Sequence, residues 1–253
     1  MLTALTRKVS PNFACCQLEY LRREPIDVAR AAMQHREYEA ALERLGPRLI
    51  SLPAEPDLPD CVFVEDPAVV LDEIAIITRM GAESRRGESE SLAAALAQFR
   101  PLVRMSEPAT LEGGDVVRIG KTLYVGLSRR TNAAGVRQLA EIVEPHGYRI
   151  VPVHVSGCLH LKSACCAVSE ETVLANRALF DASAFDCKMI DVPAEEPWAA
   201  DVLRIGDTVL IPASFPRTAR LLEQSGFQIE SLDVSELQKA EAGVTCMSLV
   251  FHK

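Results

Sequence analysis

The sequence has no long apolar run, no basic run and no Cys-x-x-Cys pair. No apolar stretch approaches the roughly 20 residues that a membrane-spanning helix needs. Residues 1–7 lack the continuous apolar core of a signal segment. A net charge of −8 disfavours nucleic acid and anionic membrane surfaces as partners. The eight cysteines match neither a disulfide framework nor a zinc ribbon, so we expect reduced thiols in the cytoplasm.

A dinucleotide or phosphate fingerprint is also absent, because Gly113-Gly114 is too short a glycine motif to form one. The composition is otherwise that of a globular protein, with 48% hydrophobic and 25% charged residues. A chain of 253 residues can bury a large core as one domain or two. An internal repeat favours a single closed domain over residues 1–253.

This repeat places an acidic or reactive residue before an apolar run at five positions. They are Glu65-Asp66, Glu112, His160, Asp201 and Cys246, and the steps from Asp66 are 46, 48, 41 and 45 residues. The segment 116–126 is nearly repeated at 202–212, an offset of 86. A repeat of this period indicates one supersecondary unit used several times. If the units close around an axis, the five reactive turns converge on one centre.

Each unit is expected to run from the reactive turn into a β-hairpin, then a helix, then a return strand. Helical spacing of apolar residues is found in 92–99, 136–143 and 219–222, and a long helix is expected at 28–45. Return strands are expected at 48–52, 102–103, 150–155, 188–192 and 228–232. The chain ends within its fifth hairpin, so that hairpin must borrow Leu2–Thr6 from the N-terminus. The alternative is an open α/β sandwich.

Cys246 is the candidate nucleophile, because a thiolate attacks an electrophilic carbon better than other common side chains. A buried core cysteine is the alternative, but only this cysteine occupies the reactive position of its unit. Among the five histidines, only His160 is in phase with Cys246. Its expected role is general acid and base near neutral pH, and the alternative is a core histidine bonded to backbone.

The carboxylates indicate the substrate. Asp60, Glu65 and Asp66 crowd one turn, and Glu112 and Asp115 crowd another. Several acids beside a thiol would suppress its ionisation unless a cation enters with the substrate. A planar guanidinium is such a cation, forms paired hydrogen bonds with carboxylates and carries an electrophilic carbon. Solvated surface acids are the alternative for any one of these residues.

Six segments resemble the dimethylarginine dimethylaminohydrolase family of the guanidino-group-modifying superfamily, and they follow the family order along nearly the whole chain. The matching segments are Leu58–Asp66, Ile77–Arg86, Thr110–Asp115, Gly126–Asn132, Leu159–Ser163 and Gly243–Ser248. The resemblance implies the pentein fold, a five-bladed α/β propeller of ββαβ units around a central active site. It also implies that no metal or organic cofactor is required.

By this resemblance, Cys246 attacks the guanidinium carbon of a methylated arginine to form a covalent thiouronium. His160 protonates the departing methylamine or dimethylamine and then activates water, which yields citrulline. Glu112, as a third catalytic residue, and Asp66 would hold the guanidinium nitrogens.

The resemblance also implies a wider substrate-binding set. Asp60 and Glu65 would support the site, and Arg85 and Arg130 would clasp the α-carboxylate of the substrate. Leu18, on an N-terminal loop, would bind the α-amine through its carbonyl. Ala240 is expected in the same set.

The chain departs from the family at Asp201, where asparagine is common, and at Met80, where proline is usual. The rival hypotheses are an arginine deiminase, which is typically longer, a hydrolase of another guanidino compound such as agmatine, and a non-catalytic pentein resembling a ribosome anti-association factor. The sequence leaves open whether the protein is a monomer or a homodimer.

Overall fold

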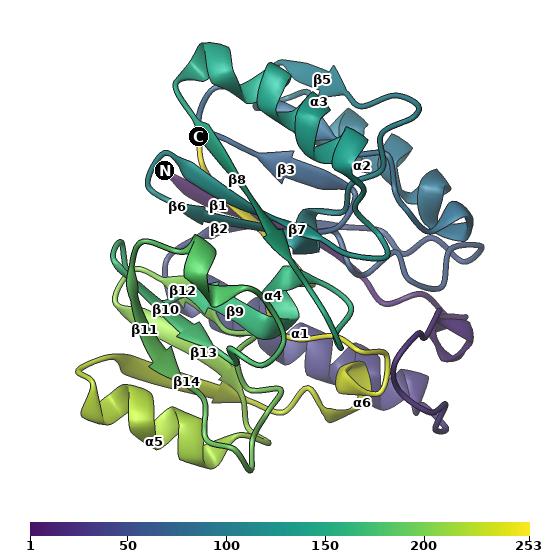
Figure 1. Cartoon of the computed structure of the whole chain (residues 1–253). Coiled ribbons are helices and arrows are strands. Elements are labelled where there is room, and N and C mark those ends of the chain that lie inside the picture. Colours follow the sequence, from purple (N-terminus) through teal and green to yellow (C-terminus); the bar gives the residue numbers. More distant parts are fainter.

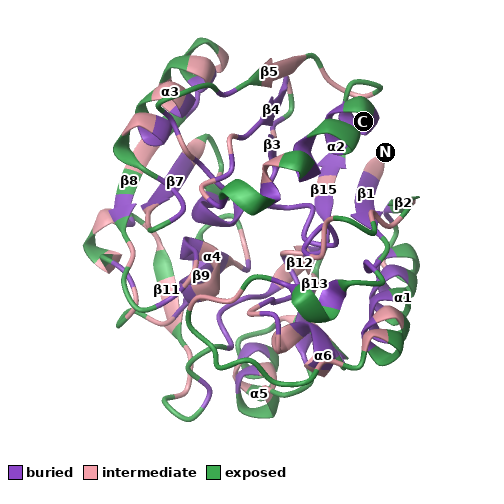
Figure 2. Cartoon of the chain, turned by 90° about the vertical axis from the view of Figure 1, so that its right-hand side faces the viewer, coloured by how far each residue is buried: buried purple, intermediate pink, exposed green.

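The computed structural model describes residues 1–253 as five three-stranded sheets (Figure 1). Seen from the side, the sheets are arranged in a ring (Figure 2). Each sheet has a middle strand that pairs with two neighbours. The sheets are β15 (Leu249–His252), β1 (Leu2–Arg7) and β2 (Arg48–Leu52); β3 (Ala68–Val70), β4 (Ala75–Ile77) and β5 (Leu102–Arg104); β6 (Val116–Ile119), β7 (Thr122–Leu127) and β8 (Arg149–His154); β9 (Cys165–Ala167), β10 (Thr172–Ala175) and β11 (Lys188–Asp191); β12 (Leu203–Ile205), β13 (Thr208–Pro212) and β14 (Gln228–Leu232).

All five sheets share one pairing pattern. The first strand runs antiparallel to the middle strand, and the third runs parallel to it. A parallel pair needs a crossover, whereas an antiparallel pair needs only a tight turn. Each sheet is therefore a hairpin followed by a longer connection, as the repeat predicts, and the open sandwich is wrong.

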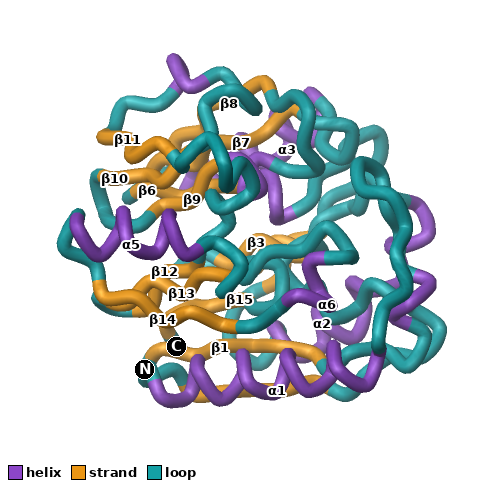
Figure 3. The backbone as a smooth tube through the Cα atoms, turned by 90° about the horizontal axis from the view of Figure 1, so that it is seen from below, coloured by secondary structure: helices purple, strands orange, loops and turns teal.

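The ring closes through the two ends of the chain. Strand β1 pairs with β15 in the register Leu2↔His252 to Leu5↔Leu249, and the Lys253 amide donates to the Met1 carbonyl at 2.9 Å. Figure 3 shows the termini side by side. The prediction that the last hairpin borrows its partner from the N-terminus is confirmed.

The longer helices lie on the outside of the ring (Figure 2). They are α1 (Val28–Arg44), α2 (Ser89–Leu96), α3 (Ala133–Val143) and α5 (Pro216–Gln224), and the short helices are α4 (Leu161–Ala164) and α6 (Ser235–Gln238). Two longer helices begin with a side-chain cap: Asp27 accepts from the Arg30 amide, and Asn132 accepts from the Gly135 amide. Neither these helices nor the short ones are long and apolar enough to cross a membrane.

The fourth unit departs from the expected order, because no α-helix connects β10 to β11. Only a 3₁₀ turn, Ala182–Ala184, lies between them. Here Phe185 stacks on Tyr124 of the neighbouring sheet at 3.9 Å between ring centroids, and Phe180 packs edge-on against Phe185. The connection thus buries its aromatic rings as a loop, without the periodic apolar face that a helix needs.

The middle strands are almost wholly buried. Every residue of β4 and β10 is buried, as are all but the first residues of β1 and β13. The third strands β2, β5, β8, β11 and β14 consist mainly of partly buried and exposed residues. Each hairpin therefore begins near the centre of the ring, so the turns before β3, β6, β9, β12 and β15 meet there.

We predict that the seam where the ring closes is a major source of stability. Phe251 of β15 is 5% exposed and packs edge-on against Phe99 of the second unit at 5.4 Å. Phe251→Ala should lower the free energy of unfolding by about 3 kcal/mol, because it leaves a cavity between two sheets. Chemical denaturation measures this. Met33→Ala, at a residue 45% exposed on α1, is the control and should change it by less than about 0.5 kcal/mol. An equal effect of the two substitutions would contradict the role of the seam.

Candidate active site

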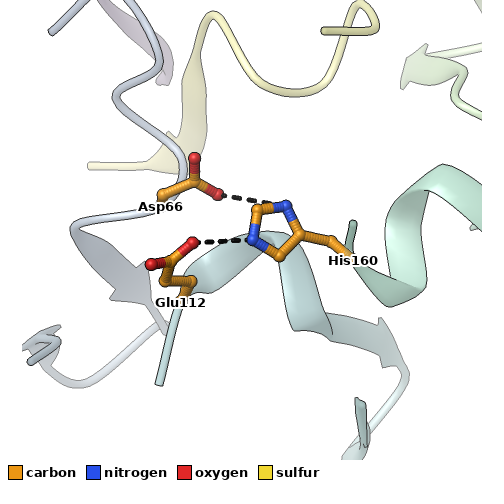
Figure 4. A group of neighbouring side chains, drawn as sticks. All are labelled: Asp66, Glu112 and His160. Carbon is orange, nitrogen blue, oxygen red and sulfur yellow. Dashed lines mark hydrogen bonds and ion pairs between the residues drawn. The ribbon is translucent and has the colours of Figure 1, made fainter. Parts of the chain in front are cut away.

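The imidazole of His160 lies between two carboxylates from different units (Figure 4). Its Nε2 is 2.7 Å from Glu112 Oε2, and its Nδ1 is 3.7 Å from Asp66 Oδ1. The three residues come from the turns before β9, β6 and β3, and all three are buried. The structure thus brings together three of the five reactive positions at one point.

This arrangement favours the imidazolium form of His160. Burial opposes the charge, but the charge of Asp66 and the hydrogen bond that His160 donates to Glu112 prevail and raise the pKa of His160 to about 9. The contact between His160 and Glu112 lowers the pKa of Glu112. Burial disfavours the Glu112 carboxylate, but His160, Arg85 and Arg130 hold its pKa well below the usual range. At neutral pH His160 therefore carries a proton that it can donate.

Two features hold His160 in place. The Asp115 carboxylate accepts from the Leu161 amide at 2.9 Å and from Ser128 Oγ at 2.6 Å, which fixes the loop after His160. A Cβ atom on Gly114 would stand 2.6 Å from His160 Nδ1 and 2.8 Å from Asp66 Oδ1. The glycine pair, which is no phosphate motif, is thus required for the close approach of His160 and Asp66.

Cys246 lies in the turn before β15 and is partly buried. Its Sγ accepts from the Gly243 amide at 3.4 Å and lies 3.8 Å from Asp201 Oδ2. Burial raises the pKa of this thiol well above its usual range, and the charges of Asp201, Glu65 and Asp66 raise it further. Asp201 comes from the turn before β12, so the last two reactive positions also meet, as the repeat predicts.

Arg85 and Arg130 neutralise the carboxylates of the site. Arg85 donates to Asp66 at 2.8 Å and grips Glu88 through two nitrogens at 2.9 and 2.8 Å. Arg130 donates to both oxygens of Glu112, at 3.2 and 3.0 Å, and its Nε donates to Glu19. Both guanidinium groups are buried ion pairs, so a substrate carboxylate would have to share them with these acids.

Glu65 contacts the turn that carries Cys246 and does not line the cavity beside His160. Its two oxygens contact Lys162 Nζ at 2.5 Å and Thr245 Oγ1 at 2.9 Å. Because Thr245 precedes Cys246, this bridge fixes the turn that presents the thiol. Asp60 accepts from the Gln17 amide at 3.2 and 3.1 Å and thereby fastens the N-terminal loop.

A small cavity of about 20 Å³ lies among these residues. It is lined by Gln17, Asp60, Phe63, Asp66, Arg85, Arg130, Leu159, His160, Ala240, Glu241, Ala242 and Cys246. Most of the expected site residues contact it. Glu112, Glu65 and Leu18 do not line it. Glu112 is hydrogen-bonded to His160, and the Leu18 side chain packs against the core cluster beside α1. A larger cavity of about 340 Å³ shares the walls Leu159, Glu241 and Ala242 and reaches Asp201, but His160 and Cys246 do not line it.

Sequence reasoning missed Glu241. Its Oε1 accepts from three successive amides of the N-terminal loop: Glu19 at 3.0 Å, and Tyr20 and Leu21 at 2.6 Å. The residue itself has a left-handed backbone, φ 62°, which is uncommon for a non-glycine residue. Glu241 therefore ties the loop over the cavity, and no apolar periodicity or motif marks it.

Asp66, Glu112 and His160 also have the residue types of a metal site, and one ligand atom from each lies within 4.8 Å of the others. The two carboxylates face opposite nitrogens of the ring, and each already pairs with a buried guanidinium. Cations held this close would repel a divalent ion. The arrangement therefore favours proton transfer at His160.

Comparison with known proteins identifies the family. A family model described as arginine deiminase matches residues 53–201. An N(G),N(G)-dimethylarginine dimethylaminohydrolase of Streptomyces coelicolor is 43% identical over 247 residues, which cover 97% of this chain and 95% of the relative. The relative of the same name from Pseudomonas aeruginosa is 39% identical and covers 89% and 90% of the two chains. The chain belongs to the dimethylarginine dimethylaminohydrolase family.

A solved structure of a dimethylarginine dimethylaminohydrolase extends this similarity to three dimensions. A cysteine-to-serine mutant of the Pseudomonas aeruginosa enzyme complexed with citrulline superimposes with a TM-score of 0.94 at 35% identity, over 99% of this chain and all of that one. The five three-stranded sheets described above are therefore the pentein fold of this family.

We predict that the charge of Glu112 sets the protonation of His160. Glu112→Gln keeps the shape of the side chain but removes its charge, so the pKa of His160 should fall from about 9 by about 1 to 3 pH units. NMR titration of isotopically labelled histidine rings measures this. Glu107→Gln, at a carboxylate with 77% side-chain exposure, is the control and should leave His160 unchanged. An unaltered titration in Glu112→Gln would show that another group stabilises the imidazolium.

Proposed function

We propose that this protein hydrolyses Nω-methylated arginine, either asymmetric dimethylarginine or monomethylarginine, to citrulline and dimethylamine or methylamine. The observation that carries the proposal is that Cys246 and His160 line one cavity together with the buried carboxylates Asp60 and Asp66, while Glu112 is hydrogen-bonded to His160. Its family relatives are named for this reaction. The carboxylates supply the charge that a guanidinium cation needs, and the thiol supplies the nucleophile.

The first half of the reaction forms a covalent intermediate. Asp66 and Glu112 bind the guanidinium nitrogens, and Cys246 Sγ attacks the central carbon. The carbon–nitrogen bond to the methylated nitrogen then breaks, and the imidazolium of His160 gives its proton to the departing amine. A charged acid is available because Asp66 and Glu112 keep the pKa of His160 near 9.

The second half releases citrulline. Neutral His160 takes one proton from a water molecule, whose hydroxide adds to the thiouronium carbon. The carbon–sulfur bond then breaks and expels Cys246, and the second proton of the water leaves the product oxygen to solvent. The Glu112 carboxylate, which is hydrogen-bonded to His160 Nε2, stabilises the imidazolium that forms when His160 takes this proton from water. Each turnover consumes one water and returns His160 to its cationic form.

We assign substrate positioning to the remaining residues of the expected set. Asp60 and Ala240 line the cavity, whereas Glu65 acts through Thr245 on the cysteine turn. Gln17 and Glu19 flank Leu18, and their contacts with Asp60 and Arg130 support placing the Leu18 carbonyl near the α-amine. Arg85 and Arg130 would receive the α-carboxylate by sharing their present ion pairs.

We further propose that the whole chain acts as one catalytic domain, because the site draws residues from all five units. The eight unpaired cysteines support a reducing compartment such as the cytoplasm. An acidic protein with a walled cavity fits a small cationic substrate better than nucleic acid or a membrane surface.

Comparing citrulline release from methylated arginine, arginine and agmatine tests the substrate class. Preference for unmethylated arginine would favour the deiminase hypothesis, and no release from any of them would favour a binding protein.

Cys246→Ser and Cys246→Ala should abolish citrulline formation without unfolding the protein. Loss of a covalent nucleophile should lower kcat by roughly 10⁴-fold or more. Cys15→Ser, at an exposed cysteine, is the matched control and should retain full activity. Activity of a Cys246 variant above about a tenth of wild type would refute the nucleophile. Labelling by a halogenated amidine, located by mass spectrometry, should map to Cys246 alone.

Arg130→Ala should weaken recognition of the amino-acid end of the substrate. A buried arginine–carboxylate contact is worth a few kcal/mol, so KM for methylated arginine should rise by about 10- to 1,000-fold. KM for the decarboxylated analogue should rise much less. Arg130→Lys should restore activity only in part, because an ammonium lacks the planar fork of the guanidinium. Arg129→Ala, at the adjacent exposed residue, is the control and should leave KM for both substrates unchanged. Equal losses for both substrates would mean that Arg130 serves Glu112 and not the carboxylate.

A further inference from the structure

Asp201 is in direct contact with the nucleophile. Its Oδ2 lies 3.8 Å from Cys246 Sγ, within the range of a hydrogen bond that involves sulfur. The sulfur in turn accepts from the Gly243 amide at 3.4 Å. With the amide supplying a donor on one side, the thiol proton is directed toward the carboxylate on the other.

The contact is built into the turn that presents the thiol. Asp201 Oδ1 accepts from the Thr245 amide at 3.0 Å, and its Oδ2 is 3.3 Å from Thr245 Oγ1. A Cβ atom on Gly243 would lie 2.0 Å from Asp201 Cγ, so the backbone closes against the carboxyl group only because residue 243 is glycine. Asp201 is 6% exposed. Its position is therefore fixed by the same turn that fixes Cys246.

The other base of the site is already occupied. Both nitrogens of His160 face carboxylates, and the proton that His160 carries at neutral pH is the one needed by the departing amine. An imidazolium cannot accept the thiol proton as well. No other carboxylate oxygen lies within hydrogen-bond distance of Cys246 Sγ, whereas Asp201 Oδ2 does.

We propose that Asp201, at a position where asparagine is common in the family, gives this chain its own base, which takes the proton from Cys246 when the guanidinium substrate enters. The S–H bond breaks, an O–H bond forms at Asp201 Oδ2, and the sulfur lone pair forms the bond to the guanidinium carbon. When water later expels the sulfur, the carbon–sulfur bond breaks and Asp201 returns the proton to it. The step moves one proton within the site and rests on the proposed hydrolysis of a guanidino compound.

The surroundings of Asp201 suit it to this exchange. Burial first, and then the charge of Glu65, raise the pKa of Asp201 to about 7, although Thr245 and Lys162 oppose the rise. Apart from Cys246, the other titratable groups that face it are the thiol of Cys166 and the hydroxyl of Tyr38. A carboxylate with this proton affinity is a better base at neutral pH than an exposed aspartate.

Asp201→Asn tests the proposal, because the amide keeps the shape and the contact with Thr245 but cannot take the proton. Asparagine is common at this position in the family, so the variant should remain active by losing the thiol proton to solvent. At pH 7 it should lose about 10-fold in kcat/KM, less than general-base catalysis usually contributes, and the loss should shrink as rising pH helps solvent remove the thiol proton. Asp207→Asn, at an exposed residue of the β12–β13 turn, is the control and should match wild type. Unchanged or increased kcat/KM would mean that Asp201 only opposes thiolate formation and would overturn the proposal. An equal loss at every pH would reduce Asp201 to a positioning residue and would overturn it too.

A second measurement uses the wild-type protein and does not depend on the folding of a variant. Methylguanidinium chloride is mixed with the enzyme at pH 8 in weak buffer, and thiolate absorbance and proton release are followed together before turnover. Thiolate should appear without release of a matching proton, after subtraction of the same titration on Cys246→Ser. One proton released for each thiolate formed would overturn the proposal.

The proposed function and the proposed role of Asp201 can be refuted separately. If wild type forms no citrulline from any guanidino compound, the proposed function is wrong. If wild type is active and Asp201→Asn remains as active at pH 7, the function stands and only the proton acceptor is wrong.

Discussion

Buried negative charge at the centre of the ring is the constraint on which this site depends. Seven buried carboxyl groups lie in or directly around it: Asp60, Glu65, Asp66, Glu88, Glu112, Asp115 and Asp201. Only four cationic groups compensate them: Arg85, Arg130, His160 and Lys162. A buried charge without a partner is costly. The centre therefore either holds protons or attracts a further cation.

This imbalance divides the chemistry among the reactive groups. Next to Asp66 and Glu112, His160 stays protonated and can serve as the acid. Next to Asp201 and Glu65, Cys246 stays a neutral thiol. A guanidinium cation changes both conditions at once, because it offsets the carboxylates and presents an electrophilic carbon. Under the proposed function, the enzyme therefore acquires its nucleophile mainly when the substrate is bound.

Much of this architecture follows from the sequence, because a repeat constrains position. The spacing from Asp66 to Cys246 predicted that five turns converge, and the incomplete last hairpin predicted the pairing of residues 2–6 with the C-terminal strand. Periodicity does not give side-chain direction. It could not show that Asp115 turns away to hold the Leu161 amide, or that Asp201 touches the sulfur.

Contacts between irregular segments were the least predictable. Glu241 binds three amides more than 200 residues away in sequence, and its left-handed backbone carries no local signal. Glu88, which grips Arg85, lies on a short 3₁₀ helix outside the repeated frame. The absence of a helix in the fourth unit also depends on contacts between irregular segments. Phe185 stacks on Tyr124 and Phe180 packs against Phe185, and this aromatic packing takes the place of the helix found in the other units.

The claim that the thiol ionises only with a cation in the site is tested most directly by titrating Cys246 itself. Thiolate absorbance of wild type, corrected with Cys246→Ser, is followed from acid to alkaline pH with and without saturating methylguanidinium. The account predicts a thiol pKa well above its usual range in the free protein and a clear fall when the cation is bound. An equally low thiol pKa in both titrations would contradict it.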